Sequence, residues 1–138
     1  MKKRSVLSKI LRAAAFVLAA LVLLALVNFF PAFSLKTLGM QQLTGEYVTV
    51  FYETEQAAAE DVFSLAETRG GELADLLGLA QQEPVQIYIY DQQSVMQTKK
   101  YGLIAPLLHL DWYNGDNIGA KVLLTSPANP GPAHSYED

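Results

Sequence analysis

The residues near the carboxyl end of the sequence carry part of a metal-binding pattern. His134 and Glu137 stand in the order H-x-x-E, which on a helix would place an imidazole and a carboxylate one turn apart. An inverted zinc motif requires a second histidine directly after the glutamate, but position 138 is aspartate. A helical His-x-x-Glu occurs often by chance. We therefore interpret these residues as loop and helix-cap residues and predict no metal site here.

His109 and Asp111 form a second candidate pair. They flank Leu110, so on a strand both side chains would lie on one face. Zinc takes three or four protein ligands, and the sequence holds only one further histidine, His134. We therefore interpret His109 and Asp111 as a polar surface pair beside Trp112.

Three other patterns that could support catalysis or ion binding are incomplete. Asp116-Asn117 lacks the ligand spacing of an EF-hand loop and fits turn chemistry better. Ser126 precedes a proline and lacks the G-x-S-x-G elbow of a serine nucleophile. Gly70-Gly71 follows a helical pattern, whereas phosphate-binding glycine loops follow a strand. The residues present therefore predict no catalytic residue and no metal ligand.

The charges of the chain are segregated. The first 33 residues hold five basic residues and no acid, whereas the other 105 hold five basic residues and all fourteen acids. An acidic body argues against a nucleic-acid partner, because phosphate contacts require a basic face. The sequence contains no cysteine, which excludes disulfides, thiolate metal sites and cysteine nucleophiles.

One segment is apolar for long enough to cross a membrane. Ala13 to Phe33 contains a single polar residue, Asn28, and its 21 residues would span about 31 Å as a helix, the thickness of a hydrocarbon core. A cleaved signal peptide has a shorter apolar region, of about 7–15 residues, and a small-residue cleavage site. The aromatic stretch N-F-F-P-A-F-S favours an uncleaved signal anchor over residues 13–33, with a cleaved signal as the alternative.

The flanking charges predict how this segment is oriented. All five basic residues of the N-terminal part lie within residues 1–12, while only Lys36 follows the span closely. By the positive-inside rule, residues 1–12 form a cytoplasmic basic segment and the acidic body lies outside. We expect a single-pass protein in which Pro31 ends or kinks the helix near the outer interface.

The rest of the chain reads as a tether, residues 34–45, and one small α/β (α+β) region, residues 46–138. Alternating apolar residues predict strands, and apolar residues three and four apart predict helices. Gly70-Gly71 interrupts the longer helix and predicts a kink or a split there, with Thr54 and Gly78 as its caps. We expect an incomplete, mixed sheet of about three strands. The expected strands are 46–53, 84–90 and 121–126, and the expected helices are 55–77 and 92–100.

Three stretches of this region occur in the order of a known domain. They are "VTVFYE" with the alanine-rich acidic helix after it, "PVQIYIY", and "WYNGDNIGAKVLLTSPANPGPAHSYED". With them the chain, from about Glu46 onward, resembles a bacterial family of membrane-anchored zinc metallopeptidases. These are the peptidase-MA-like gluzincins, whose catalytic domain is related to thermolysin. The resemblance covers about two thirds of the chain, and its last stretch is the most specific.

The resemblance implies a role for the last expected strand. In such peptidases the strand before the active-site helix is a sheet edge, along which the backbone of a peptide or protein substrate pairs. "KVLLTS" looks like that strand, so its residues would form the substrate-binding edge. The helix that follows in the family carries H-E-x-x-H, whose histidines hold zinc and whose glutamate activates the bound water. None of those catalytic or metal residues has a matching position here. The implied edge residues are Val122, Leu123, Leu124 and Thr125.

We therefore expect the N-terminal fragment of an extracellular zinc metallopeptidase, anchored in a bacterial cell membrane through residues 13–33. Zinc is implied only for the full-length family protein, and we expect neither zinc binding nor hydrolysis from this chain alone. The alternative is a complete, non-catalytic binding module tethered to the membrane, which recruits a partner strand to the exposed edge. An anchored domain of some other role is a third interpretation. Cooperative unfolding of the part outside the membrane would favour a complete module over a fragment.

Overall fold

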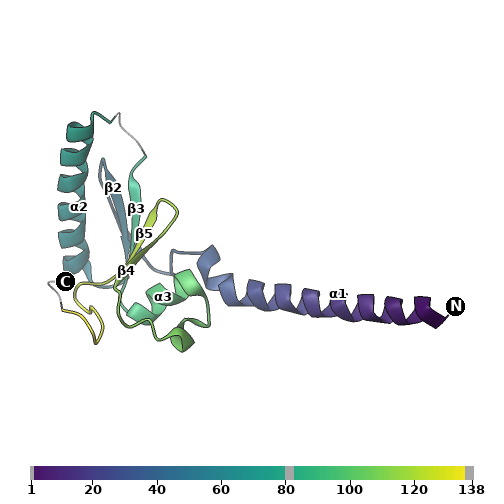
Figure 1. The fold of residues 1–138 in the computed structure, drawn as a ribbon. Helices are drawn as coiled ribbons and strands as arrows, with labels where there is room; N and C mark the ends of the chain where they lie inside the picture. Colours follow the sequence, from purple (N-terminus) through teal and green to yellow (C-terminus); the bar gives the residue numbers. More distant parts are fainter. Residues whose placement is uncertain (1, 80–82, 136–138) are drawn as a thin grey trace.

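In the computed structural model, which describes residues 2–79 and 83–135, a long N-terminal helix projects from an α/β domain (Figure 1). The helix α1 carries no charged residue from Ala13 onward, and Val6–Phe33 is long and apolar enough to cross a membrane. Pro31 lies in the 3-10 turn that follows α1, as expected for a proline that ends an α-helix. The elements are α1 (Lys2–Phe29), η1 (Phe30–Phe33), β1 (Gln41–Thr44), β2 (Val48–Tyr52), α2 (Gln56–Leu77), β3 (Val85–Tyr90), α3 (Gln93–Tyr101), η2 (Ala105–Leu108), β4 (Gly115–Ile118) and β5 (Lys121–Thr125).

The described residues form one mixed sheet with the strand order β1-β2-β3-β5-β4. The three central strands, β2, β3 and β5, are parallel, and they confirm the three strands expected from the sequence. The expected number of strands is wrong, because β1 and β4 add one antiparallel strand at each edge. Both edge strands are short and polar, so they lack the alternating apolar pattern that predicts a strand.

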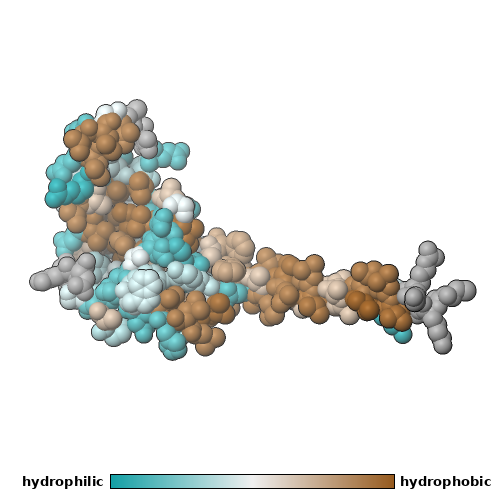
Figure 2. All heavy atoms as spheres, viewed as in Figure 1, coloured by the Kyte–Doolittle hydropathy of each residue, from teal (hydrophilic) through white to brown (hydrophobic). Residues whose placement is uncertain are grey.

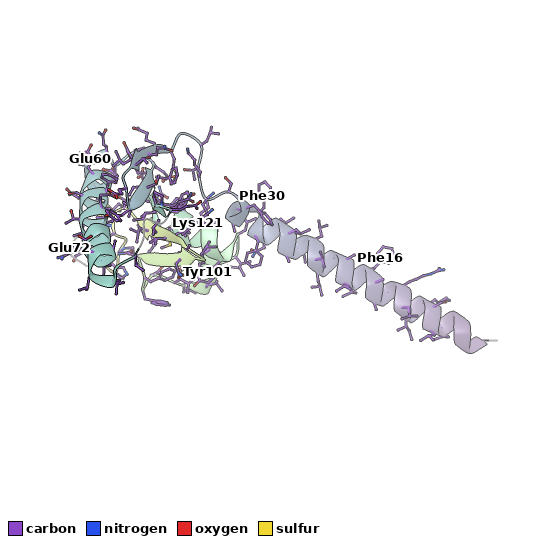
Figure 3. The ribbon with its side chains drawn as sticks, turned by 90° about the horizontal axis from the view of Figure 1, so that it is seen from above. Phe16, Phe30, Glu60, Glu72, Tyr101 and Lys121 are labelled. Carbon is purple, nitrogen blue, oxygen red and sulfur yellow. The ribbon has the colours of Figure 1, made fainter. Side chains whose placement is uncertain are left out.

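The sheet buries an apolar cluster on each face. On one face α2 packs on β2, and the cluster there includes Val50, Ala59 and Ile89. On the other face α3 packs on β3 and β5, and the cluster includes Tyr90 and Met96. The acidic residues of α2 lie mostly away from the sheet, and Figure 3 shows Glu60 and Glu72 on its outer side. The two covered faces explain why most positions of the central strands carry apolar residues.

The segment expected to be a tether is part of the folded domain. Leu35 and Met40 are buried in the same cluster as Tyr90, and the Tyr90 hydroxyl donates a 2.7 Å hydrogen bond to the Leu35 carbonyl. Burial raises the pKa of Tyr90, which keeps the phenol a neutral donor. The prediction of a tether over residues 34–45 is therefore wrong, because this segment supplies core side chains and the edge strand β1.

Helix α2 continues without interruption through Gly70-Gly71, so the prediction of a split helix there is wrong. The glycines make room for the side chain of Tyr47, which crosses the helix at this point. A Cβ at Gly70 would lie 2.7 Å from the Tyr47 Cβ, and a Cβ at Gly71 would lie 3.2 Å from the edge of the Tyr47 ring. Gly78 ends the helix with φ 61°, as expected for a left-handed cap.

The start of α2 differs from expectation. Its N-cap residue is Glu55, which makes no side-chain capping bond. Thr54, the expected cap, instead donates its hydroxyl to the carboxylate of Asp91 at the end of β3. The threonine therefore links the ends of two neighbouring parallel strands rather than the first turn of the helix.

Substituting Gly70 by alanine should destabilise the domain, although alanine normally stabilises a helix relative to glycine by about 1 kcal/mol. The new methyl group would overlap the stem of Tyr47, which cannot move without moving the backbone. We expect Gly70→Ala to lower the free energy of unfolding by about 1–3 kcal/mol. Urea unfolding of the full-length chain in detergent micelles, followed by circular dichroism, measures this.

Gly71→Ala is the matched control, because its new methyl group would meet only the ring edge of Tyr47, which can shift. We expect it to unfold close to or above the wild-type midpoint. Equal midpoints for the two variants would contradict the steric role assigned to Tyr47.

Candidate functional site

The strand expected at the sheet edge is an interior strand. β5 pairs in parallel with β3 on one side and antiparallel with β4 on the other. The prediction that Val122, Leu123, Leu124 and Thr125 form the edge is therefore wrong. The reason is a two-residue turn at Gly119-Ala120, where Gly119 adopts φ 59° and folds β4 back along β5 as a hairpin. The outer edge of the sheet belongs to Gly115–Ile118.

The four predicted edge residues divide between the two faces of the sheet. Val122 and Leu124 lie half-buried on the face that α2 covers, and Leu123 and Thr125 are buried on the opposite side. Their backbone groups pair with β3 on one side and with β4 on the other. These residues therefore position the edge strand, but they are not exposed for pairing with a substrate.

Two buried glutamines of α3 position the loop that leads into β4. The Gln97 side-chain amide donates a 2.6 Å hydrogen bond to the Leu110 carbonyl. The Gln93 amide donates to the carbonyls of Asp111, at 3.3 Å, and Tyr113, at 2.8 Å. These carbonyls belong to irregular backbone, where no neighbouring strand or helix supplies a hydrogen-bond donor. The glutamine side chains supply the donors instead.

The free side of β4 is partly covered by a charged pair. Because Thr125 donates its amide to the Asn114 carbonyl, the alternation of an antiparallel ladder turns the backbone groups of Gly115 and Asn117 outward. The amide of Asn117 donates to the Asp116 carboxylate at 2.7 Å, and its carbonyl accepts from Lys100 Nζ at 2.7 Å. We call these contacts the Asp116–Lys100 cap. They leave the outward backbone groups of Gly115 as the accessible part of the edge.

Asp116 and Lys100 also bond each other at 2.5 Å, with 19% and 26% of their side chains exposed. The Tyr101 hydroxyl donates to the second oxygen of Asp116 at 3.3 Å. Burial alone would raise the pKa of Asp116, but the hydrogen bonds from Lys100, the Asn117 amide and Tyr101 outweigh it. The pKa of this carboxyl therefore lies below its ordinary value of 3.8, and Asp116 is charged at neutral pH.

A second feature of the site is exposed apolar surface beside the sheet. α2 packs mainly on β2, so on the same face of the sheet Val122 and Leu124 are only half-buried. Figure 2 shows hydrophobic side chains on α2 and between α2 and the sheet. We call the large exposed residues of this region the apolar strip. Its members are Leu65, Leu73, Leu76 and Leu77 of α2 and Val85 at the start of β3, each between 44% and 80% exposed.

The residues singled out for chemistry do not meet in the described part of the chain. His109 ends η2 in a left-handed conformation with φ 49°, so His109 and Asp111 do not share a strand face. Ser126 is fully buried, and its Oγ accepts a hydrogen bond from the Ala128 amide within a turn. Among residues 2–79 and 83–135 no group of three His, Asp or Glu side chains could hold a metal ion. Glu137 and Asp138 lie outside the described residues.

Sequence reasoning missed the edge strand itself. The stretch G-D-N-I holds three residues that are rare in strands, and the only available signals were the turn at Asn114-Gly115 and the bend at Gly119. Neither a family model, nor a curated protein, nor a solved structure matches this chain.

Removing the Gln97 amide should loosen the edge strand. Gln97→Ala leaves the Leu110 carbonyl without its donor, and an unsatisfied buried group costs about 1–3 kcal/mol. We expect a loss of unfolding free energy in that range and faster hydrogen exchange of the β4 amides. Gln92→Ala, at the exposed N-cap residue of α3, should change neither, because the Gln92 side chain makes no capping bond. Unchanged β4 exchange in Gln97→Ala would contradict the positioning role.

The Asp116–Lys100 cap predicts a pH dependence. Because the folded pKa of Asp116 is depressed, its contribution to stability is present above pH 3.8 and is lost as the pH falls through the folded pKa. Asp116→Asn should therefore be less stable than wild type by about 1 kcal/mol at pH 7. That difference should shrink toward zero at lower pH.

Urea midpoints across the acid range measure this effect. Asp111→Asn, at an exposed carboxylate of the same loop, is the control and should follow the wild-type curve. A difference between Asp116→Asn and wild type that persists unchanged below the folded pKa would contradict the cap.

Proposed function

We propose that this chain is the N-terminal, substrate-binding part of a membrane-anchored extracellular zinc metallopeptidase of the gluzincin type. α1 serves as an uncleaved signal anchor, with residues 1–12 in the cytoplasm and the acidic domain outside a bacterial cell. The length and apolar composition of Val6–Phe33 and the five basic residues at its start support this arrangement. The resemblance of residues 46–138 supports the class of enzyme.

The observation that carries the proposal is the uneven cover of the sheet. α2 covers the β2 side of one face, while Val122 and Leu124 of β5 remain half-buried on that face. Four of the five residues of the apolar strip lie on α2, and exposed apolar side chains that lie together are typical of an interaction site. In the proposed enzyme a further helix, which carries H-E-x-x-H, packs on this half of the face.

The proposed substrate site is the β4 edge. A peptide that adds to the sheet pairs first with the outward backbone groups of Gly115, because the Asp116–Lys100 cap occupies those of Asn117. Extending the pairing along β4 requires Lys100 and Asp116 to release Asn117. The cap therefore weakens nonspecific pairing at this edge, as charged residues do on the edges of many sheets.

No residue of this chain is assigned a catalytic or metal-binding role. The zinc that the family implies would supply a nucleophilic, metal-bound water. Its two histidine ligands would come from the H-E-x-x-H helix, and a further acidic ligand would come from a later helix. The described residues contribute the sheet, the loop that Gln93 and Gln97 hold, and the edge strand.

A second candidate is a non-catalytic, membrane-tethered binding module. The observation that favours it is the apolar cluster on each face of the sheet, each built from several side chains that are less than 9% exposed. A domain with such a core could fold alone and recruit a partner strand at Gly115. The two candidates differ in whether the apolar strip needs a further helix to cover it.

The coding sequence downstream of the Asp138 codon tests the proposal directly. We expect an H-E-x-x-H helix there, either in frame or after a frameshift. Its absence from every frame would remove the chemistry from the proposal and favour the binding module.

The purified 138-residue chain gives an independent test. We expect no stoichiometric zinc by elemental analysis and no chelator-sensitive peptide hydrolysis, because the family's ligands have no matching positions here. Stoichiometric zinc or chelator-sensitive hydrolysis would contradict the proposal.

The chain from Ser34 onward should also self-associate through the apolar strip, which size-exclusion chromatography detects. Leu76→Lys is expected to reduce this association, because Leu76 is 80% exposed.

A further inference from the structure

The only polar side chain of the apolar segment is bonded to the folded domain. Asn28 lies one residue before the end of α1, and its Nδ2 donates a 3.1 Å hydrogen bond to the Tyr101 carbonyl. Its Oδ1 accepts from the Ile104 amide at 3.0 Å, and its backbone carbonyl accepts from the Leu103 amide at 3.0 Å. The amide and carbonyl of Asn28 thus bind the loop that follows α3.

Gly102 allows this close approach. It adopts φ 81°, and a Cβ at this position would collide with the Asn28 carbonyl. The loop from Tyr101 to Ile104 therefore lies directly against the last turn of α1. In Figure 3 the middle of α1, marked by Phe16, lies far from the domain, whereas Phe30 lies where the helix meets the domain.

The depth of Asn28 in a bilayer follows from the length of the span. A hydrocarbon core that begins after Arg12, the last basic residue, ends about 20 residues later, near Ala32. Asn28 then lies about 6 Å inside the outer boundary, at 1.5 Å per residue. Its backbone partners, Leu103 and Ile104, must lie at a similar depth. The hydrogen bonds explain how a polar side chain and irregular backbone are tolerated there, because each unsatisfied group in lipid costs several kcal/mol.

The side chains of this loop suit that environment. Figure 2 shows hydrophobic residues gathered over η2, immediately beside the junction with α1. Four of them, which we call the loop patch, point away from the protein core. They are Leu103, Ile104, Leu107 and Leu108, with 55%, 46%, 77% and 42% of their surface exposed.

A basic side chain marks the outer limit of this apolar region. Lys99 of α3 donates from its Nζ to the Ser34 carbonyl, directly after η1. Burial lowers the pKa of Lys99, although Glu53 opposes this effect. Its ammonium group lies at the level where the span ends, and long basic side chains commonly extend to the headgroups from such positions.

We propose that the loop patch inserts into the outer leaflet beside α1 and forms a second membrane contact that fixes the orientation of the domain. We expect lipid to cover the loop patch. The backbone of the patch is hydrogen-bonded to the part of α1 that the span length places inside the bilayer. The contact makes the domain and its anchor one rigid body at the membrane surface. The β4 edge, which α3 holds through Gln93, Gln97 and Lys100, then has a fixed orientation relative to the bilayer.

This inference rests on the part of the proposed function that places α1 across a membrane, and the experiment separates the two. The chain contains no cysteine, so single cysteines can be introduced and labelled with an environment-sensitive fluorophore. The label is placed at Leu107 in the loop patch, at Leu18 in the middle of α1, or at Glu72 on the outer side of α2. The three side chains are exposed, at 77%, 63% and 56%, so labelling should not disturb the fold.

Each full-length variant is reconstituted in vesicles of phosphatidylethanolamine and phosphatidylglycerol that contain nitroxide lipids. We expect the Leu107 label to be quenched several-fold more than the Glu72 label, and most strongly by nitroxides near the headgroups. The Leu18 label should be quenched best by nitroxides deep in the acyl chains. Adding Asn28→Leu and Gly102→Val to the Leu107 variant should reduce its quenching while leaving that at Leu18 unchanged, because these changes break the junction.

Three results would overturn the inference. A Leu107 label as accessible to water as the Glu72 label, with Leu18 deeply quenched, would leave the anchor intact and exclude the second contact. A Leu18 label that lipid nitroxides do not quench would reject the anchor and the inference together. A Leu107 label that is shielded from water only at high protein-to-lipid ratio, without quenching by lipid nitroxides, would show that a second copy covers the patch.

Discussion

The parallel pairing of β3 with β2 and β5 is the constraint on which the rest of this structure depends. Successive side chains of β3 alternate between faces, so Ile87 and Ile89 pack under α2 while Tyr88 and Tyr90 pack under α3. Parallel neighbours also require crossover connections. The first connection supplies α2, and the second supplies α3, η2 and β4. One strand therefore determines where both helices lie, and its own side chains are covered on both faces.

Helix α3 contacts the loop before β4, the strand β4 and the end of α1. Gln93 and Gln97 hold the loop before β4, and Lys100 covers the outer side of that strand. At its carboxyl end, the Tyr101 carbonyl accepts a hydrogen bond from Asn28 of α1. A helix of nine residues thus links the sheet edge to the long apolar helix α1 through direct contacts. Under the functions proposed here, substrate pairing and membrane orientation depend on the same element.

Much of the fold could be predicted from the sequence because its central elements carry strong local patterns. β2, β3 and β5 are rich in β-branched and aromatic residues, and α2 repeats apolar residues at helical spacing. Predictions failed where a distant partner determines the conformation. Gly70 and Gly71 looked like a helix break because the sequence does not reveal that Tyr47 crosses there. Residues 34–45 looked like a tether because their partners, such as Tyr90, lie far along the chain.

The sequence by itself determined the long apolar helix, the segregation of charge and the three central strands, since each depends on composition or on neighbours within a few residues. Only the tertiary structure decided which strand forms the edge. β4 is polar and short, and it exists because its backbone pairs with β5 and because α3 satisfies the loop before it. The role of Asn28 was decided in the same way. A lone asparagine in an apolar segment has no partner nearby in the sequence. Its hydrogen-bond partners are supplied by residues 101–104, which the fold brings next to it.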